Sequence, residues 1–358
     1  SGKGSITKQE VVPMYSEFDN TRRWLDTDGN PIQAHGGSIM AADGVFYWYG
    51  ENKELTDGEN GIWWNGVRCY SSRDLYNWKS EGIIIPADTA LSPTLAQTSQ
   101  ADRPHILFCK ATGRFVCWIK IMEKDGTQDY TILSAERLLG PYRLEKEHFR
   151  PLGFSGGDFD LAEDNGEACI FFEKVHSEMI CARLTPDYLD VADWVSFLPR
   201  PCPPFVREAP AHFSRDGVHY LITSGTTGYF PNPSLLCMAE RLFGAYTEIG
   251  DPHIGDASRT SFHSQISSVF KIPGREVWIA LADRWLPDCM GIPYETVEKV
   301  FALAFSGRTA EALALKNTLN LPPENTSKAG YIWLPVTFET GKPQIRWYAK
   351  WKWEQTNA

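Results

Sequence analysis

An internal repeat constrains this chain more than any other feature. Residues 135–142 and 239–246 are nearly identical, and residues 73–78 are a looser copy of them. Short alternating or aromatic-rich runs are joined by Asp-Gly, Asn-Gly, Thr-Gly and Pro-Gly pairs, which are strong signals for hairpin turns. Because the two close copies lie two units apart, the repeating unit is roughly fifty to sixty residues long.

Five such units fit between residues 33 and 352. Their hairpin turns lie at residues 43–44, 112–113, 165–166, 216–217 and 273–274, and runs at 331–336 and 345–348 complete the last unit. A period of this length with about four strands per unit is typical of propeller blades. We predict an all-β fold, a five-bladed β-propeller of four-stranded antiparallel blades with almost no helix. Two β-sandwiches would also use short strands, but they would not explain the near-identical copies.

The repeat also suggests how the chain is divided. We expect residues 13–354 to form a single propeller domain, and we interpret residues 1–12 as a tail or a remnant of cloning. No second domain is expected beside the propeller.

Charge and cysteine content limit the partners and the compartment. A net charge of −10 without a basic run argues against nucleic acid or an anionic membrane as a partner. No run approaches the roughly eighteen apolar residues of a membrane-spanning helix. The eight cysteines form no CxxC pair, and Cys117 and Cys169 lie within strand-like runs, which favours reduced thiols and a cytoplasmic protein. Removal of a leader would instead make the protein secreted or periplasmic.

Polar residues stand at the starts of the predicted innermost strands. In a propeller these strands line the central funnel, so their first residues converge on the axis. Each predicted start carries one polar group: His35, Asp102, Asp158, Glu208 and Gln265. The clearest starts are residues 156–160 and 207–210, where a carboxylate opens an apolar run.

Carboxylates gathered in a narrow funnel have a chemical consequence. They repel one another and lose solvation, which raises the pKa of at least one of them. A carboxylic acid that stays protonated near neutral pH can donate a proton to a glycosidic oxygen. Inverting glycosidases place this donor about 6.5–9.5 Å from the group that activates water, a span that opposite sides of a funnel can supply.

These motifs resemble glycoside hydrolase family 43, specifically its exo-β-1,3-galactanase and exo-galactosidase branch. The resemblance covers nearly the whole chain and is carried by residues 26–30, 34–37, 47–51, 103–104, 157–158, 207–210, 223–225, 264–265, 283–285 and 333–335. It implies a five-bladed propeller, hydrolysis from the non-reducing end with inversion, and no obligatory cofactor. A structural calcium or other ion in the central channel is left open.

The resemblance implies roles for the strand-start residues. Glu208 would be the general acid, and Asp158 would orient it and hold its pKa up. Most of the family has an Asp general base on the first blade, but residues 34–36 take that place here. The galactanase branch has Gln at the position of Gln265, proposed as an imidic-acid base, and Asp102 stands where the branch generally has Glu. Asp102 would help Gln265 or be the base itself through a water.

Each of these assignments has a structural alternative. Glu208 would otherwise be salt-bridged to Arg207, Asp158 would form a turn, and Gln265 would hydrogen-bond a neighbouring blade. Substrate-contacting candidates are His35, Glu51, Tyr130, Thr226 and Trp285, each of which could instead be structural. Most of the 13 tryptophans should pack in the core, with some facing sugar rings. No spacing around His35 supports a zinc site, so no metal ligands are predicted.

The sequence therefore predicts an exo-acting inverting glycosidase that releases galactose from β-1,3-galactan or arabinogalactan-type glycans. An α-L-arabinofuranosidase, β-xylosidase or β-galactofuranosidase is the alternative on the same scaffold, and a non-catalytic carbohydrate-binding propeller is the alternative of another class. The propeller of residues 13–354 would be the catalytic domain, and no appended carbohydrate-binding module is expected, which favours short or soluble substrates over bulk polysaccharide. The expected partner is an oligosaccharide substrate, and the expected state is a monomer or a weak homo-oligomer.

Overall fold

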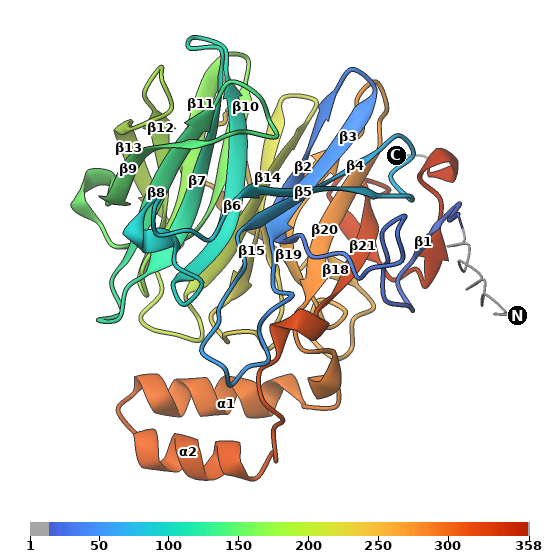
Figure 1. The fold of residues 1–358 in the computed structure, drawn as a ribbon. Helices are drawn as coiled ribbons and strands as arrows, with labels where there is room; N and C mark the ends of the chain where they lie inside the picture. The colour runs from blue at the N-terminus through green and yellow to red at the C-terminus, as the bar shows by residue number, and fades with distance from the viewer. Residues whose placement is uncertain (1–13, 357–358) are drawn as a thin grey trace, which may run out of the picture.

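A ring of five β-sheets forms the computed structural model, which describes residues 14–356 (Figure 1). The first two blades are antiparallel sheets whose strands follow chain order: β2 (His35–Ala42), β3 (Val45–Glu51), β4 (Val67–Ser72) and β5 (Lys79–Ile85), then β6 (Gln100–Cys109), β7 (Arg114–Met122), β8 (Gln128–Ala135) and β9 (Arg143–Phe149). The third and fourth blades repeat this order: β10 (Gly156–Asp164), β11 (Glu167–Lys174), β12 (Glu178–Leu184) and β13 (Val191–Phe197), then β14 (Arg207–Arg215), β15 (Val218–Gly225), β16 (Leu235–Ala239) and β17 (Thr247–Gly250).

The fifth blade has one extra strand. Its antiparallel part consists of β19 (Gln265–Lys271), β20 (Trp278–Arg284), β21 (Gly330–Thr337) and β22 (Gln344–Arg346), and the short β18 (His253–Ile254) adds to β22 in parallel. The first strands of neighbouring blades contact each other around the ring, in the order β2, β6, β10, β14, β19 and back to β2. The predicted five-bladed propeller of four-stranded antiparallel blades is therefore confirmed.

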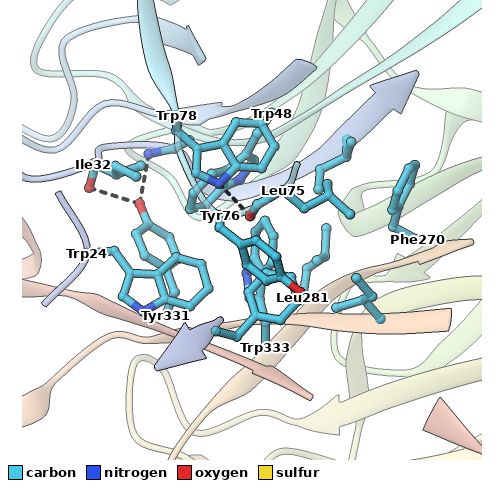
Figure 2. Close-up of a cluster of buried hydrophobic side chains, with 14 of the residues drawn as sticks. Trp24, Ile32, Trp48, Leu75, Tyr76, Trp78, Phe270, Leu281, Tyr331 and Trp333 are labelled. Atoms are coloured by element: carbon cyan, nitrogen blue, oxygen red, sulfur yellow. Dashed lines mark hydrogen bonds between the residues drawn. The ribbon is translucent and has the colours of Figure 1, made fainter. Parts of the chain in front are cut away.

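The ring is closed by a seam between the first and fifth blades. The N-terminal strand β1 (Phe18–Asp19) pairs with β23 (Lys350–Trp351), and the side-chain amide of Asn20 exchanges two hydrogen bonds with the backbone of Trp333. Figure 2 shows aromatic rings of both blades packed together around Trp24. Nine of the 13 tryptophans are buried, so most of them do pack in the core.

The two near-identical segments form the same turn in different blades. In the second blade the Tyr142 hydroxyl donates to the Leu138 carbonyl at 2.9 Å, and in the fourth the Tyr246 hydroxyl donates to the Leu242 carbonyl at 3.0 Å. All four side chains are buried between sheets. The repeat in the sequence is thus a repeat in packing as well.

The expectation of almost no helix was wrong. Two helices, α1 (Tyr294–Phe305) and α2 (Thr309–Asn317), form a hairpin inserted between β20 and β21. Val297 anchors α1 in a buried cluster with Phe230 and Trp285, whereas Ala312 is the one buried residue of α2. The apolar spacing at residues 294, 297 and 301 is helical and was the available signal.

The structure also bears on three smaller expectations, which concern the cysteines, membrane-spanning helices and the N-terminal tail. All eight cysteines are free thiols, as predicted, and seven of them are buried. Within residues 14–356 no helix has the length and apolar character to cross a membrane. The predicted tail, residues 1–12, lies outside the described part of the chain.

Candidate active site

Each inner strand is irregular just where its polar residue stands. All five pair with the next strand through a register shift close to the strand start. In three blades the residue after the polar one has a left-handed backbone: Gly36, Arg103 and Ala209, with φ of 59°, 51° and 49°. Such bulges turn side chains away from the regular alternation of a strand. At the strand starts, the direction of a side chain therefore does not follow the regular alternation between the two faces of the sheet.

Four of the five strand-start residues meet in one cavity of about 330 Å³. Asp102, Asp158, Glu208 and Gln265 all line it, from four different blades. The predicted acid and its modulator therefore line the same cavity as the two residues predicted to activate water. His35, the fifth, does not reach the cavity.

Asp158 is the centre of a buried ion-pair network. Its carboxylate contacts Arg103 Nε at 2.9 Å and Lys120 Nζ at 2.8 Å, and it also accepts a hydrogen bond from the backbone amide of Ala209. Burial raises the pKa of Asp158, but the two cations outweigh burial and lower it to about 2. Asp158 is therefore an ionised carboxylate fixed beside Glu208.

Glu208 has no such partner. Within the described chain no cation lies within 4 Å of its carboxylate, and Arg207 instead donates to Thr223 and to the carbonyl of Pro233. The salt bridge to Arg207 that was the structural alternative is absent. Burial, followed by the charges of Asp158 and Glu173, raises the pKa of Glu208 well above its usual value. This environment thus favours the protonated form of Glu208.

Asp102 is held by cations on the other side of the network. Lys120 Nζ lies 3.1 Å from Oδ2, Lys53 Nζ lies 3.8 Å from Oδ1, and Trp63 Nε1 donates to Oδ1 at 2.7 Å. Burial raises the pKa of Asp102, but Lys120 and Lys53 lower it overall, so this carboxylate is ionised. No hydrogen bond joins it directly to Gln265 in the described structure.

Gln265 is locked in one amide orientation. Its Oε1 accepts from Arg103 Nη2 at 2.6 Å and from Trp285 Nε1 at 3.0 Å, while its Nε2 donates to Ser224 Oγ at 2.8 Å. Because Arg and Trp can only donate, the oxygen must face them. One N–H of the amide remains for another acceptor.

The expected substrate contacts divide into two groups. Glu51, Thr226 and Trp285 line the cavity. Burial is the main reason that the pKa of Glu51 rises to about 7, despite Lys53 at 3.0 Å.

His35 and Tyr130 are corrections, because neither lines the cavity. His35 is fully buried between Asp283, at 2.9 Å, and the ring of Tyr331. Tyr130 is also fully buried and donates to the carbonyl of Gly157 at 2.7 Å. Both residues support the inner strands through hydrogen bonds. His35 was predicted from the strand starts, which do not say which way a side chain turns, and Tyr130 was predicted from the family resemblance.

Several cavity residues were not predicted. Lys120 and Glu173 lie at the ends of second strands, across the hairpin from Asp102 and from the start of β10. Trp63 comes from the loop after β3, and Phe301 comes from α1. Reading across each predicted hairpin would have pointed to Lys120 and Glu173.

The described residues offer one cluster with the donor types of a metal site. Glu123, Asp129 and His148 bring ligand atoms within 4.8 Å of one another on the second blade, outside the cavity. Elsewhere on the inner strands, His105 Nε2 is buried without a hydrogen-bond partner. Neither His105 nor the Glu123, Asp129 and His148 cluster lines the catalytic cavity.

The comparisons with known proteins agree with this geometry. Residues 29–268 match the model of the glycosyl hydrolases family 43. Two family 43 β-1,3-galactosidases of known structure have TM-scores of 0.75 and 0.74, with 25% and 24% identity over 94% of this chain. The chain spans 63% of the first and 100% of the second.

An exo-β-1,3-galactanase from Phanerochaete chrysosporium, solved with β-1,3-galactotriose, has a TM-score of 0.73 and 23% identity over 94% of this chain and 68% of its own. No curated protein sequence matches. Because the matched segment exceeds half of the sequence, this chain belongs to family 43 of the glycosyl hydrolases.

Proposed function

We propose that the protein is an exo-acting hydrolase that releases terminal galactose, with inversion, from β-1,3-galactan or arabinogalactan-type glycans. The observation that carries this proposal is Glu208, a cavity carboxyl group with a raised pKa and no cationic partner in the described chain. The similar structures include β-1,3-galactosidases and a galactanase bound to β-1,3-galactotriose, which favours galactose as the terminal sugar.

In the proposed reaction, Glu208 gives its proton to the glycosidic oxygen while the bond from that oxygen to the anomeric carbon breaks. A water molecule attacks the anomeric carbon from the opposite face, and a base takes one of its protons. Glu208 and the base then return to their starting states by proton exchange with solvent. Burial and the charge of Asp158, which Arg103 and Lys120 keep ionised, favour the protonated form of Glu208 between turnovers.

We propose Asp102 as the base and Gln265 as the group that positions the water. An imidic acid would carry a proton on Oε1 of Gln265, where Arg103 and Trp285 already donate. These donors favour the ordinary amide, whose free N–H can hold a water oxygen. Asp102 is an ionised carboxylate in the same cavity and can accept the proton.

The first experiment is hydrolysis of β-1,3-galactobiose followed by proton NMR. The expected first product is α-galactose, because a single displacement inverts the β-linkage. If nitrophenyl arabinofuranoside, xyloside or galactofuranoside is hydrolysed and galactobiose is not, the corresponding alternative activity replaces this proposal. If no glycoside is hydrolysed, a binding function is favoured.

A second experiment tests the base. Asp102→Asn should lower kcat more than Gln265→Ala, and azide should restore turnover of Asp102→Asn by forming α-galactosyl azide. A larger loss in Gln265→Ala, with no azide product from Asp102→Asn, would instead assign the base to Gln265.

A further inference from the structure

The catalytic cavity has a buried end and an exposed rim. Glu51, Arg103 and Asp158 are exposed by only 1%, 5% and 7%. Along the rim, Tyr229 and Phe301 are half-buried and His176 is exposed. An enzyme that removes a terminal sugar needs this arrangement, because the terminal ring enters the closed end and the rest of the substrate stays at the rim. The rim residues are therefore the ones that meet the leaving group.

Helix α1 runs across this rim. It is inserted in the fifth blade, and it carries Phe301 into the cavity wall. One turn later, Phe305 packs edge-on against His176 of the third blade, with ring centroids 5.1 Å apart at 76°. Figure 1 shows the helical hairpin lying across one end of the ring. The mouth of the cavity is thus bridged from the fifth blade to the third.

Phe301 continues an aromatic wall. Tyr229 lies between Trp63 and Trp285, with ring centroids 5.9 Å and 5.0 Å away, and Phe301 packs in the same cluster as Tyr229. Among these rings Phe301 alone carries no hydrogen-bonding group. Its contribution to a bound sugar is therefore contact with the C–H face of the ring.

We propose that Phe301 is a specificity-determining residue that packs against the sugar ring of the leaving group. This inference rests on the proposed function. Val297 holds α1 on the propeller, so the phenyl ring is fixed at the rim before substrate arrives. Helix α2 does not line the cavity and serves as a matched control region.

The test compares two substrates with the same terminal sugar. β-1,3-Galactobiose has a sugar as its leaving group, whereas β-galactosyl fluoride has only fluoride. Phe301→Ala should lower kcat/KM for galactobiose by roughly tenfold and leave the fluoride within about twofold of the parent. Phe301→Tyr, which keeps the ring, should stay near the parent on both. Leu313→Ala, an exposed apolar position of α2, should also match the parent on both substrates.

The possible failures are distinguishable. Equal losses on both substrates would mean that Phe301 acts through the fold or the catalytic groups. No loss on either, or the same selective loss in Leu313→Ala, would mean that its ring does not contact the leaving group. A parent enzyme that hydrolyses neither compound would contradict the proposed function and this inference together.

Discussion

Two buried acidic groups on neighbouring inner strands differ in how their charge is balanced. At the strand starts, Glu208 has no cation within 4 Å in the described structure, and burial and neighbouring carboxylates raise its pKa. On β10, Asp160 lies 2.7 Å from His105 Nδ1 and accepts a 2.6 Å hydrogen bond from the backbone amide of His212. The hydroxyls of Ser38 and Ser268 are also paired, at 2.7 Å.

The difference shows what separates a reactive group from a structural one in this molecule. Burial lowers the pKa of His212 to about 3, so the ring is neutral. Asp160 joins three blades, whereas Asp158, two residues earlier, lies in the cavity. The bulge at the start of β10 separates the two roles.

The largest effect is expected at Glu208. Glu208→Gln should lower kcat on β-1,3-galactobiose by roughly a thousandfold, because the leaving oxygen no longer receives a proton. The loss should be much smaller on a dinitrophenyl galactoside, whose leaving group needs no proton. Steady-state kinetics on both substrates measure this, and equal losses would rule out the acid role.

The matching substitution at Asp160 should change stability instead of turnover. Asp160→Asn weakens the contacts to His105 and to the His212 amide, so the free energy of unfolding should fall by about 3 kcal/mol. Chemical denaturation measures that fall, and kcat per folded molecule should stay at the parent value. A large loss of kcat with unchanged stability would mean that Asp160 takes part in catalysis, and the proposed difference between the two acidic groups would be wrong.

A smaller effect tests how the two aspartates differ in their influence on the acid. Burial is the main cause of the raised pKa of Glu208, and the charge of Asp158 is the next. Asp158→Asn removes that charge, so the pKa of Glu208 should fall and the alkaline limb of kcat/KM should move to lower pH. Asp160→Asn should leave the limb in place. A shift of the limb to higher pH in Asp158→Asn would contradict the network described above.

The smallest effect is expected in the two repeated turns, which lie outside the catalytic cavity and test stability alone. Tyr142→Phe and Tyr246→Phe each remove one hydroxyl-to-carbonyl hydrogen bond in equivalent turns. Each should lower the free energy of unfolding by about 1 kcal/mol, without a change in kcat. Very different losses at the two positions would show that the repeated turns are not energetically equivalent.

Much of this architecture could be predicted because its signals are local. Turn dipeptides mark each hairpin, and the copies at residues 135–142 and 239–246 set the period. Together they place the five strand starts, four of which meet in the cavity. The family resemblance then gave Glu208 and Asp158 their expected roles, and their charge environment supports those roles.

The errors have physical causes. His35 stands at a strand start, yet its ring turns towards Asp283 and Tyr331, because a bulge changes side-chain direction in a way that a period of two cannot reveal. Lys120 was missed because its role depends on its register opposite Asp102. The hairpin of α1 and α2 was missed because it interrupts a repeat that otherwise contains only strands.

The seam that joins the first and fifth blades also governs when the ring can be completed. The side-chain amide of Asn20 forms its two hydrogen bonds with the backbone of Trp333 only once that residue, which lies 313 residues further along the chain, is in place. Until the last blade folds, the tryptophans of the first blade lack the packing partners that the fifth blade supplies. An incomplete chain therefore exposes aromatic side chains, which favours aggregation. Completion of the fold therefore requires the last blade to cover the aromatic side chains of the earliest segment.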